Sequence, residues 1–595
     1  WPRQLHILVD CSQSSLFTEV FWQRVVAITR STLNRAYTMS FLLRLSLLFA
    51  ILPWARGQGE MATDIYLGDI NVMVLTDVHS WVAGHGRHEP GQNADYGDVL
   101  SFYEHLKEIC TEDGSDLFFV MNGDFMDGTG LSAHPPSALV NILKKMPWDA
   151  INVGNHDIAN LETVQYITQP GGFVQWWEDK YLTSNVVKAG TSTPLGARFK
   201  MLYGAISEST VLTFGFIYNF MNAANLVKVE QVELVVNSDW FSDVLGGVHG
   251  DFDAILVLAH MDINNELIDI ILARIREIAG LDMPVQFIAG HTHIRAAEDV
   301  DKFSAAFEAG RYLDTIGFVS FPMKDPSLGT DARSEFKHSF INTNTEYMRA
   351  TLDIDSLETR EGKGLSTFIH DIEESMGILT YEGCSPITFV TETKQDARNS
   401  LWRLLYEEVI PAELPGWNST KDIFVAGSGS LRYDLFKGDV LRTDIISVSP
   451  FYDKIYKLRD DLPGRVLIQL KNTLTSMVDL WHDGHTELPP YLFSGEIKEA
   501  EKYSLYTSQY FVDQVSNVLE SVLYAETFNN VGSVQAVLVQ GVTTTDMWLR
   551  FIKIKWNKCP VGYDGGSEAE GEPGGRENIG ALDRGGKIGI GITLA

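Results

Sequence analysis

The amino-acid sequence predicts a two-domain α/β protein, on three observations. Its 595 residues exceed the size at which a single hydrophobic core stops growing. Between residue 70 and about residue 325, short apolar runs alternate with helical stretches, which is the pattern of a layered α/β domain. A second region of the same kind follows from residue 396 to residue 555. Hydrophobic residues make up 45% of the chain and charged residues 21%, so both regions belong to the ordinary globular class.

The start of the chain predicts an extracytoplasmic address. Residues 39–57 have the layout of a signal peptide, with Arg44 near the start, a short apolar run, and Ala55 and Gly57 at a cleavage position. The apolar run is too short to cross a bilayer, so we expect no permanent membrane span. Because a signal peptide sits at a true N-terminus, we expect residues 1–38 to be a non-native upstream extension. The alternative is a cytosolic protein with an apolar helix near its start.

Five apolar runs of the first region are predicted to be buried strands that end in a metal-ligand type of residue. Each run is rich in Val, Ile or Phe and is too short for a helix. Ligands collect at the carboxyl ends of strands in layered α/β folds, so the polar residues are expected to converge on one site. The runs are residues 71–77, 117–124, 150–155, 254–260 and 285–291.

The first two strand ends carry motifs that suit cation binding. Asp77 and His79 are alternate residues, so their side chains can point to the same side and chelate one cation. Gly123 permits the tight turn that brings the carboxylate of Asp124 back over its strand, where it can bridge two cations. We expect Asp127 to lie on the loop surface, with an outer hydrogen bond to the site as the alternative.

The later strand ends complete a mixed nitrogen and oxygen set. In the tetrapeptide from Gly154 to Asp157, the amide oxygen of Asn155 can ligate a metal, His156 is left to meet the substrate, and Asp157 can orient it. Such a set suits two divalent ions of Zn, Mn, Fe or Co and differs from the all-oxygen sites of calcium. The predicted ligands are Asp77, His79, Asp124, Asn155, His260, His291 and His293.

These motifs resemble those of the calcineurin-like metallophosphoesterases, whose order is DxH, GDxxD, GNHD or GNHE, H and GHxH. The resemblance implies a four-layer α/β/β/α domain over residues 58–355. It also implies that one metal is held by Asp77, His79, Asp124 and His293, and the other by Asp124, Asn155, His260 and His291. Such a metal pair activates a bridging hydroxide that attacks phosphorus. His156 would then stabilise the phosphoryl charge or protonate the leaving oxygen.

The second region resembles the C-terminal domain of 5'-nucleotidases, through segments 429–432, 436–439 and 448–451. In that branch an arginine contacts the nucleotide and two aromatic rings enclose the base, and Arg432 and Phe451 stand at matching positions. The motif that carries the second ring is missing. Tyr510 or Phe511 could replace that ring, although a core strand is our interpretation of their segment. Gly427 stands where relatives carry Asn.

Two further departures concern the loops around the motifs. 5'-Nucleotidases often have an aspartate three residues beyond the motif's histidine, where this chain has Ala159, so we expect Asp157 to serve instead. The loop after the first motif resembles that of a fungal subgroup of secreted or vacuolar 5'-nucleotidases. It contains His85 and His88. We expect these two residues not to contact the substrate, and substrate contact is the alternative.

Between and after the two domains we expect a linker over residues 356–395 and a flexible tail over residues 556–595, which is rich in Gly and Glu. The four cysteines lack any CxxC spacing, so no zinc finger or redox motif is predicted. At most one disulfide is expected among Cys110, Cys384 and Cys559, and free buried thiols are the alternative. One glycosylation sequon, at Asn418, matches the extracytoplasmic address.

The predicted function is metal-dependent hydrolysis of a small phosphorylated substrate, most directly a nucleoside 5'-monophosphate. A net charge of −31 argues against long nucleic acids, whose binding depends on Lys and Arg. One alternative is cleavage of a phosphodiester or of a nucleotide-sugar pyrophosphate, because the same metals serve both reactions. Another is a non-catalytic relative that retains the fold.

Overall fold

The computed structural model describes residues 63–325, 334–477, 488–527 and 533–558. The predicted upstream extension, the signal peptide and most of the predicted tail lie outside the described residues. Within the described part of the chain, no helix has the length and apolarity that a bilayer crossing requires. Cys110 is a buried free thiol, and Cys384 is disulfide-bonded.

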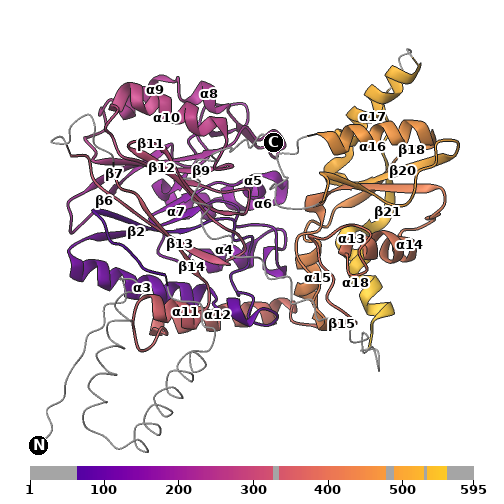
Figure 1. Cartoon of the computed structure of the whole chain (residues 1–595), viewed down its shortest axis with the longest axis horizontal. Coiled ribbons are helices and arrows are strands. Elements are labelled where there is room, and N and C mark those ends of the chain that lie inside the picture. Colours follow the sequence, from indigo (N-terminus) through magenta and orange to yellow (C-terminus); the bar gives the residue numbers. More distant parts are fainter. Residues whose placement is uncertain (1–62, 326–333, 478–487, 528–532, 559–595) are drawn as a thin grey trace, which may run out of the picture. The chain divides into compact units, whose positions relative to one another are not determined.

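The first domain is built on two six-stranded sheets (Figure 1). The strands of the first sheet are, in spatial order, β14 (Lys337–Asn342), β13 (Thr315–Phe321), β1 (Ile70–Leu75), β2 (Asp116–Asn122), β3 (Ala150–Asn152) and β4 (Tyr181–Leu182). Those of the second are β11 (Arg295–Asp301), β12 (Ser304–Ala309), β10 (Val285–Ala289), β9 (Ala254–His260), β7 (Thr210–Ile217) and β6 (Phe199–Tyr203). The central strands of each sheet are parallel, so their carboxyl ends point the same way. All five predicted strands are present.

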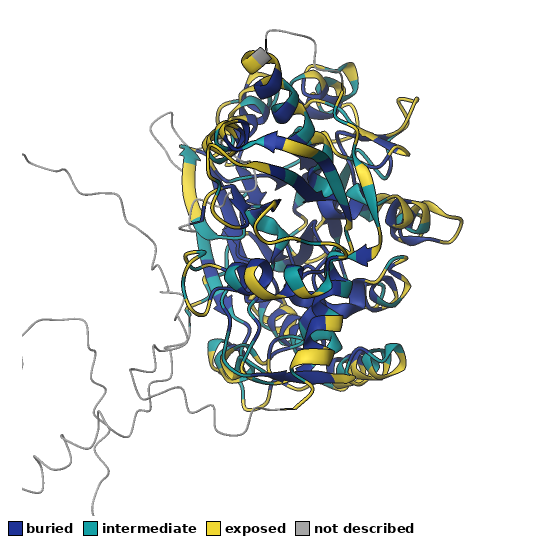
Figure 2. Ribbon diagram, turned by 90° about the vertical axis from the view of Figure 1, so that its right-hand side faces the viewer, coloured by how far each residue is buried: buried dark blue, intermediate teal, exposed yellow. Residues whose placement is uncertain are grey.

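The two sheets pack face to face because their strands alternate between two apolar surfaces. In β1, Val72 and Val74 enter the core between the sheets, whereas Met73 and Leu75 enter the core beneath the outer helices. β9 divides its residues in the same way, since Leu256 and Leu258 lie between the sheets. Strands β1 and β9 are consequently buried on both faces, whereas the edge strands β6 and β11 contain exposed residues. Many of the other exposed residues lie on outer helices and loops (Figure 2).

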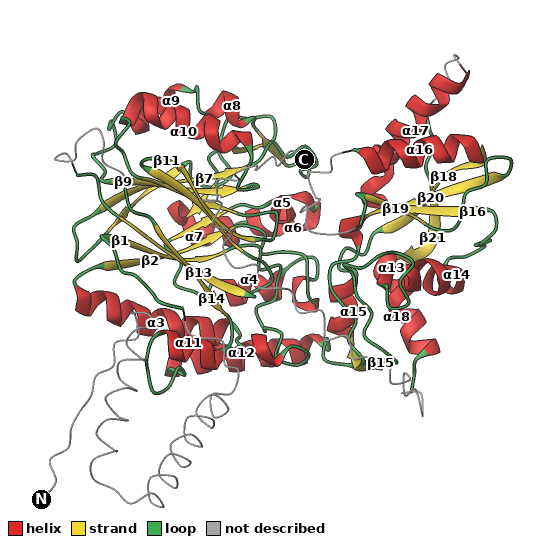
Figure 3. Cartoon of the chain, viewed as in Figure 1, coloured by secondary structure: helices red, strands yellow, loops and turns green. Residues whose placement is uncertain are grey.

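Helices cover the outer faces, which completes the predicted α/β/β/α layering (Figure 3). Packed on the first sheet are α3 (Tyr96–Asp113), α4 (Ser137–Leu143), α11 (Thr345–Thr351) and α12 (Arg360–Met376). On the second sheet lie α8 (Val232–Val235), α9 (Asp239–Leu245) and α10 (Glu266–Ala279). Short helices α5 (Asn155–Ala159), α6 (Leu161–Thr168) and α7 (Phe173–Trp177) follow β3, and β5 (Val186–Lys188) pairs with β8 (Val227–Val229).

The expected linker over residues 356–395 is wrong in its first part. Helix α12 packs against α3, and Leu365 and Ile369 belong to the core of the first domain. Gly362 of α12 and Gly97 of α3 allow this close approach, because a Cβ on Gly362 would meet the Gly97 carbonyl oxygen at 2.4 Å. The mixed charge of this segment reflects its solvent-facing side, while a narrow apolar stripe is enough to dock it.

The second domain has a five-stranded sheet with helices on both faces. Its order is β19 (Tyr491–Phe493), β16 (Asp422–Gly427), β20 (Lys502–Ser508), β18 (Lys454–Pro463) and β21 (Val537–Thr543). Helices α16 (Gly464–Ser476) and α17 (Val512–Thr527) cover one face. The other face packs against α13 (Leu401–Leu404), α14 (Ile410–Glu413), α15 (Arg442–Val448) and α18 (Thr544–Lys555), and β15 (Tyr381–Ser385) pairs with β17 (Gly438–Leu441).

A buried amide pair joins the two sheets of the first domain at their strand ends. The side-chain nitrogen of Asn152 donates to Asn122 Oδ1 at 2.9 Å and to the backbone carbonyl of Phe216 at 2.8 Å. Asn122 in turn donates to the carbonyls of Ile288 and Ala289 at 2.9 and 3.0 Å. The pair thus holds β2 and β3 of the first sheet against β7 and β10 of the second.

We expect Asn152→Ala to lower the free energy of unfolding by about 2–4 kcal/mol, because it leaves buried acceptors in both sheets without a donor. Urea unfolding followed by tryptophan fluorescence measures the change. Asn472→Ala, at an exposed position of α16, is the matched control and should change stability by less than about 0.5 kcal/mol. Equal stabilities for the two variants would contradict the bridging role.

Candidate metal centre

The seven predicted ligands come together at the carboxyl ends of the central strands. Five of the seven have an unusual backbone conformation, with φ of 50° at Asp77, 46° at His79, 51° at Asp124, 77° at His291 and 65° at His293. Residues with side chains rarely adopt positive φ, and each such residue costs about 1–3 kcal/mol. Strain of this kind persists where the surrounding structure enforces it, and it concentrates at functional sites.

Two glycines allow the loop after β2 to pack closely against the loop after β3. Gly123 has a φ of 80°, and a Cβ there would meet the backbone nitrogen of Gly154 at 2.5 Å. A Cβ on Gly154 would meet the Asp124 carboxylate at 2.2 Å. The loops after β2 and β3 therefore touch through glycine backbone, which brings Asp124 close to Asn155. The tight turn predicted at Gly123 is confirmed.

One group of ligand atoms comes from Asp77, His79 and His293. The Nε2 atoms of His79 and His293 are 3.2 Å apart, and His293 Nε2 is 3.5 Å from Asp77 Oδ1. The backbone N–H of His291 donates to the same Asp77 oxygen at 3.0 Å. All three ligand atoms lie within 4.8 Å of one another, which is the spacing that a single cation requires.

A second group comes from Asp124, His260 and His291, again within 4.8 Å of one another. His260 Nε2 lies 3.2 Å from Asp124 Oδ2 and 3.2 Å from the amide oxygen of Asn155. Asp124 Oδ2 is also 3.6 Å from His79 Nε2, so this carboxylate stands between the two groups. The Oδ2 atom of Asp124 is buried and receives no well-directed hydrogen bond. Asp124 thus lies between the two groups, and its role as the bridging ligand stays a prediction.

Hydrogen bonds to the far side of the imidazoles prepare them as ligands. His79 Nδ1 lies 2.7 Å from the carbonyl oxygen of Met126, and His260 Nδ1 lies 2.9 Å from that of Asn122. A carbonyl accepts only, so Nδ1 of each ring carries the proton. The Nε2 of a neutral ring then presents its lone pair to the centre, as metal-bound histidines do.

Electrostatics at the centre favour bound positive charge. Burial lowers the pKa of His79 and of His293 well below the ordinary value, with Arg432 adding to the effect, so both rings are neutral ligands. Burial also lowers the pKa of His260, but the carboxylates of Asp124 and Asp77 outweigh it and raise that pKa to about 10. Two buried carboxylates thus create a negative potential that cations satisfy. The donor types, their convergence and this potential fit a pair of divalent ions.

His156 projects into the pocket beside the two groups, and Asp127 holds it there. Its Nδ1 is 3.0 Å from Asp127 Oδ2, and its backbone N–H donates to Asp124 Oδ1 at 2.8 Å. The expectation that Asp127 lies on the loop surface is wrong, because only 6% of Asp127 is exposed. Burial raises its pKa, but hydrogen bonds from His134 and His156 outweigh burial and keep the carboxylate ionised. The GDxxD spacing was the signal for this role.

The place of Asp157 beside His156 predicts that it orients this ring. The structure instead directs its carboxylate to backbone N–H groups. Its carboxylate accepts from the backbone N–H groups of Gly154 at 2.8 Å, Asp124 at 3.0 Å and Phe125 at 3.1 Å. Burial and the neighbouring carboxylate of Asp124 raise the pKa of Asp157 well above its ordinary value. Asp157 therefore anchors the backbone of the two loops that carry Asp124 and Asn155.

Glu308 anchors the segment that carries His291 and His293 in the same way. This role was not predicted from the sequence. This fully buried residue accepts from Thr292 Oγ1 at 2.7 Å and from the Ile294 backbone N–H at 3.2 Å. Burial, with the charge of Asp77, raises the pKa of Glu308 to about 8. An acidic residue inside the apolar run of β12 was the available signal.

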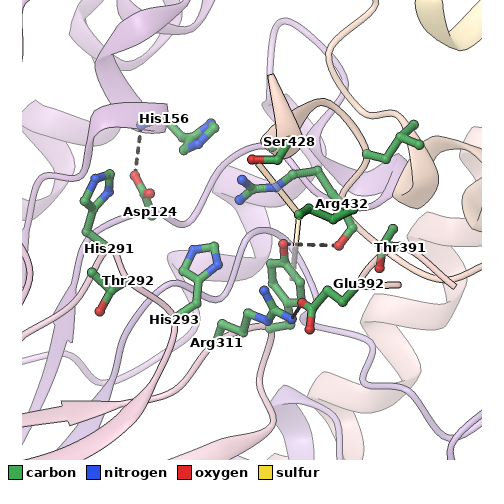
Figure 4. Close-up of a pocket in the computed structure, with 14 residues that line it drawn as sticks. Asp124, His156, His291, Thr292, His293, Arg311, Thr391, Glu392, Ser428 and Arg432 are labelled. Atoms are coloured by element: carbon green, nitrogen blue, oxygen red, sulfur yellow. Dashed lines mark hydrogen bonds and ion pairs between the residues drawn. The ribbon is translucent and has the colours of Figure 1, made fainter. Parts of the chain in front are cut away.

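The pocket over the centre is shared by both domains (Figure 4). Arg432 directs its guanidinium toward the histidines, and its Nη2 lies 3.2 Å from His79 Nε2. Arg311, from the turn after β12, forms an ion pair with Glu392 at 2.6 Å. The residues lining the pocket are Asp124, His156, His291, Thr292, His293, Arg311, Tyr312, Thr391, Glu392, Ser428, Gly429, Leu431, Arg432 and Leu488.

Phe451 contacts His156 of the pocket, whereas Phe511 is buried in the second domain. Phe451 stacks on His156, with ring centroids 5.8 Å apart and an angle of 20° between the rings. Phe511 is buried in a short 3-10 helix (Gln509–Phe511) rather than the expected strand, and packs against Tyr491. A Cβ on Gly427 would meet the Phe511 ring at 2.6 Å, which explains why glycine stands at that position.

His85 and His88 join the two domains. The ring of His85 stacks on Trp81 and is 2.5 Å from both Tyr433 Oη and the Tyr312 carbonyl oxygen. His88 Nε2 lies 3.2 Å from Asp444 Oδ1. The loop between the first motif and α3 thus holds the segment that carries Arg432.

Comparison with known proteins assigns both domains. Residues 70–295 match the model of the calcineurin-like phosphoesterases, and residues 388–548 match that of the NAD nucleotidase C-terminal domain. The chain therefore has a calcineurin-like phosphoesterase domain followed by a C-terminal domain of the NAD nucleotidase type, and it is a phosphoester hydrolase. The family resemblance and the fold class predicted from the motifs are confirmed. Phosphoesterases of this kind use a dinuclear metal centre.

Fungal relatives and solved structures agree with this assignment. An uncharacterised protein of Saccharomyces cerevisiae is 29% identical over 67% of this chain and 69% of its own length. A protein of Arthroderma benhamiae described as secreted is 24% identical, over 68% of this chain and 67% of its own. The fold is that of a 5'-nucleotidase from Candida albicans, with a TM-score of 0.74, 22% identity, and coverage of 83% of this chain and 100% of the other.

We expect Asp157→Asn to weaken metal retention by about 10- to 100-fold, because an amide offers one acceptor oxygen where the carboxylate offers two. Metal analysis after dialysis at graded metal concentrations measures the loss, and kcat at saturating metal should fall by less than about tenfold. His156→Ala is the contrasting variant and should keep its metal. Full metal retention with a large loss of kcat in Asp157→Asn would instead support the catalytic role predicted from sequence.

Proposed function

We propose that this protein hydrolyses a phosphomonoester, with a nucleoside 5'-monophosphate as the substrate. The observation that carries the proposal is the convergence of seven ligand atoms beside Arg432, in a pocket to which both domains contribute. A phosphoryl group placed there would meet the candidate centre on one side and a guanidinium on the other. Arginine matches phosphate because its planar fork donates two parallel hydrogen bonds.

The residues divide into two ligand sets in this proposal. Asp77, His79, Asp124 and His293 would hold one cation, and Asp124, Asn155, His260 and His291 would hold the other. When bound, the cations supply Lewis-acid activation of water and of the phosphoryl oxygens. Zn, Mn, Fe and Co all suit this mixture of nitrogen and oxygen donors.

His156 would serve as the acid that protonates the leaving oxygen. Water would add to phosphorus and lose one proton, the bond between phosphorus and the ester oxygen would break, and the His156 proton would pass to that oxygen. The proton released by the water then balances the one that His156 gives up, and the ring is reprotonated for the next turnover. The ionised Asp127 at 3.0 Å accepts from His156 Nδ1 and fixes the direction of the ring. Phe451, stacked on the other side of His156, limits rotation of the ring. In the proposed complex Phe451 also offers an apolar face to the nucleotide.

A second candidate substrate is a dinucleotide or another nucleotide joined through pyrophosphate. The match of the second domain to the NAD nucleotidase model favours it. Arg311, paired with Glu392, also lines the pocket, so a second guanidinium group lies near the position where a pyrophosphate would carry its second charged phosphoryl group. The ligand sets and the role of His156 are the same for both substrates.

We also propose an extracytoplasmic address, either secreted or vacuolar. The signal-peptide layout of residues 39–57 supports it, as does the description of the Arthroderma relative as secreted. Asn418 is exposed at the start of its sequon, so its side chain is accessible for glycosylation. Mass spectrometry of protein from culture medium or vacuoles would identify both the processed N-terminus and the glycan.

The test of the proposed function is phosphate release from a substrate panel with Mn, Co or Zn. We expect turnover of nucleoside 5'-monophosphates. His156→Ala should lower kcat by about 100- to 10,000-fold while two metals per chain remain bound. Asp124→Ala should lose both metals and all activity, because it removes the bridging ligand.

The panel also separates the two candidate substrates. Hydrolysis of dinucleotides with no release of phosphate from any monophosphate would favour the pyrophosphate reaction. Wild-type activity in His156→Ala would refute the assignment of the acid. A chain that never retains metal would refute the centre itself.

We expect Arg432→Ala to raise KM for the phosphorylated substrate by about tenfold or more, because a charge-assisted hydrogen bond contributes about 1.5–3 kcal/mol. Steady-state kinetics measures the change. Arg465→Ala, which removes an exposed arginine paired with Glu526, is the control and should leave KM unchanged. Matching KM values for the two variants would place the substrate away from Arg432.

A further inference from the structure

Asp127 has a second imidazole partner that lies outside the substrate pocket. Asp127 Oδ2 meets His156 Nδ1 at 3.0 Å, and Asp127 Oδ1 lies 3.3 Å from His134 Nε2. The carboxylate is buried, and 16% of the His134 side chain is exposed. His156, Asp127 and His134 therefore form a line that runs from the pocket toward the surface.

The other nitrogen of His134 is also fixed. His134 Nδ1 is 2.8 Å from Thr163 Oγ1, and Thr163 is fully buried in α6. With a neutral ring, the threonine hydroxyl donates to Nδ1, and the Nε2–H faces Asp127 Oδ1 at 3.3 Å. With a protonated ring, both nitrogens donate. Either state satisfies the contacts, so α6 holds the ring in place.

We propose that His134 is a positioning residue for the hydrolytic reaction, which orients the Asp127 carboxylate so that its Oδ2 faces His156. This inference rests on the proposed role of His156 as the acid. A carboxylate with one partner can turn about its Cβ–Cγ bond, and each turn exchanges the oxygen that faces His156. A second donor on Oδ1 removes that freedom, and a well-held supporting group is what an acid in a fixed direction requires.

The sequence around His156 increases the need for this support. Position 159, three residues beyond His156, is alanine, so no carboxylate from that helical turn can reach the ring. Asp157 is committed to backbone N–H groups. Among the described residues, Asp127 is the carboxylate placed to contact His156 Nδ1. Asp127 and Glu162 are the charged groups that face His134, and their effect outweighs burial and raises its pKa.

The experiment compares His134→Ala and His134→Gln on two substrates that differ in leaving group. A nucleoside monophosphate expels an alkoxide and needs the acid, whereas p-nitrophenyl phosphate expels a stable phenolate and hardly needs it. We expect His134→Ala to lower kcat about tenfold on the nucleotide and less than about twofold on p-nitrophenyl phosphate, with KM and metal content unchanged. His134→Gln, whose amide can donate to Asp127, should recover most of the loss.

His156→Ala is the reference that separates this inference from the proposed function. If His156→Ala lacks the leaving-group dependence, the assignment of the acid fails and the inference fails with it. If His156→Ala has that dependence and His134→Ala does not, only the inference is overturned. An equal loss on both substrates in His134→Ala would indicate a purely structural role and would also overturn it.

A second variant covers the case in which His134→Ala does not fold. Thr163→Val removes the hydroxyl that fixes His134 and keeps the shape of the side chain. We expect kcat to fall about threefold on the nucleotide, which has the poor leaving group, and to stay unchanged on p-nitrophenyl phosphate. Unchanged kinetics in Thr163→Val and in His134→Gln, beside an unfolded alanine variant, would overturn the inference.

Discussion

The hydrogen-bonded pair of Asn122 and Asn152 joins the two sheets on which the candidate centre is built. Asp77, Asp124 and Asn155 follow strands of the first sheet, whereas His260 and His291 end or follow strands of the second. Sheets that pack through apolar side chains alone can slide against each other, because such contacts have little direction. Directed hydrogen bonds from two buried amides to carbonyls of the opposite sheet fix the register within which ligand atoms can converge.

The cost of this convergence is electrostatic as well as conformational. Two carboxylates and four imidazole rings meet in a buried space, several of them on strained backbone. Asp157 and Glu308 offset part of that cost by binding the backbone N–H groups or the hydroxyl of the ligand loops. The remaining negative potential is what a pair of divalent cations satisfies, so bound metal would also stabilise the folded domain.

In the proposed function, the second domain supplies the contacts that select the substrate. It contributes Arg432 and Phe451, and the loop with His85 holds the segment that contains Arg432. The fold by itself does not select the substrate, because one fold can host unrelated reactions. Selection therefore depends on side chains that line the pocket.

The strands that carry the motifs, the order of the motifs and the types of candidate ligand atom could be predicted from the sequence, because each depends on residues that are close together in the chain. Strand ends such as 71–77 and 254–260 carry their polar residue within the same short run that forms the strand. Only the tertiary structure decided that Asp127 rather than Asp157 supports His156, and that α12 belongs to the first domain. The first outcome depends on the direction of a side chain that lies 29 residues away in the sequence. The second depends on which domain the apolar face of the helix packs against. Neither quantity is encoded in a local pattern, since packing between distant segments sets both.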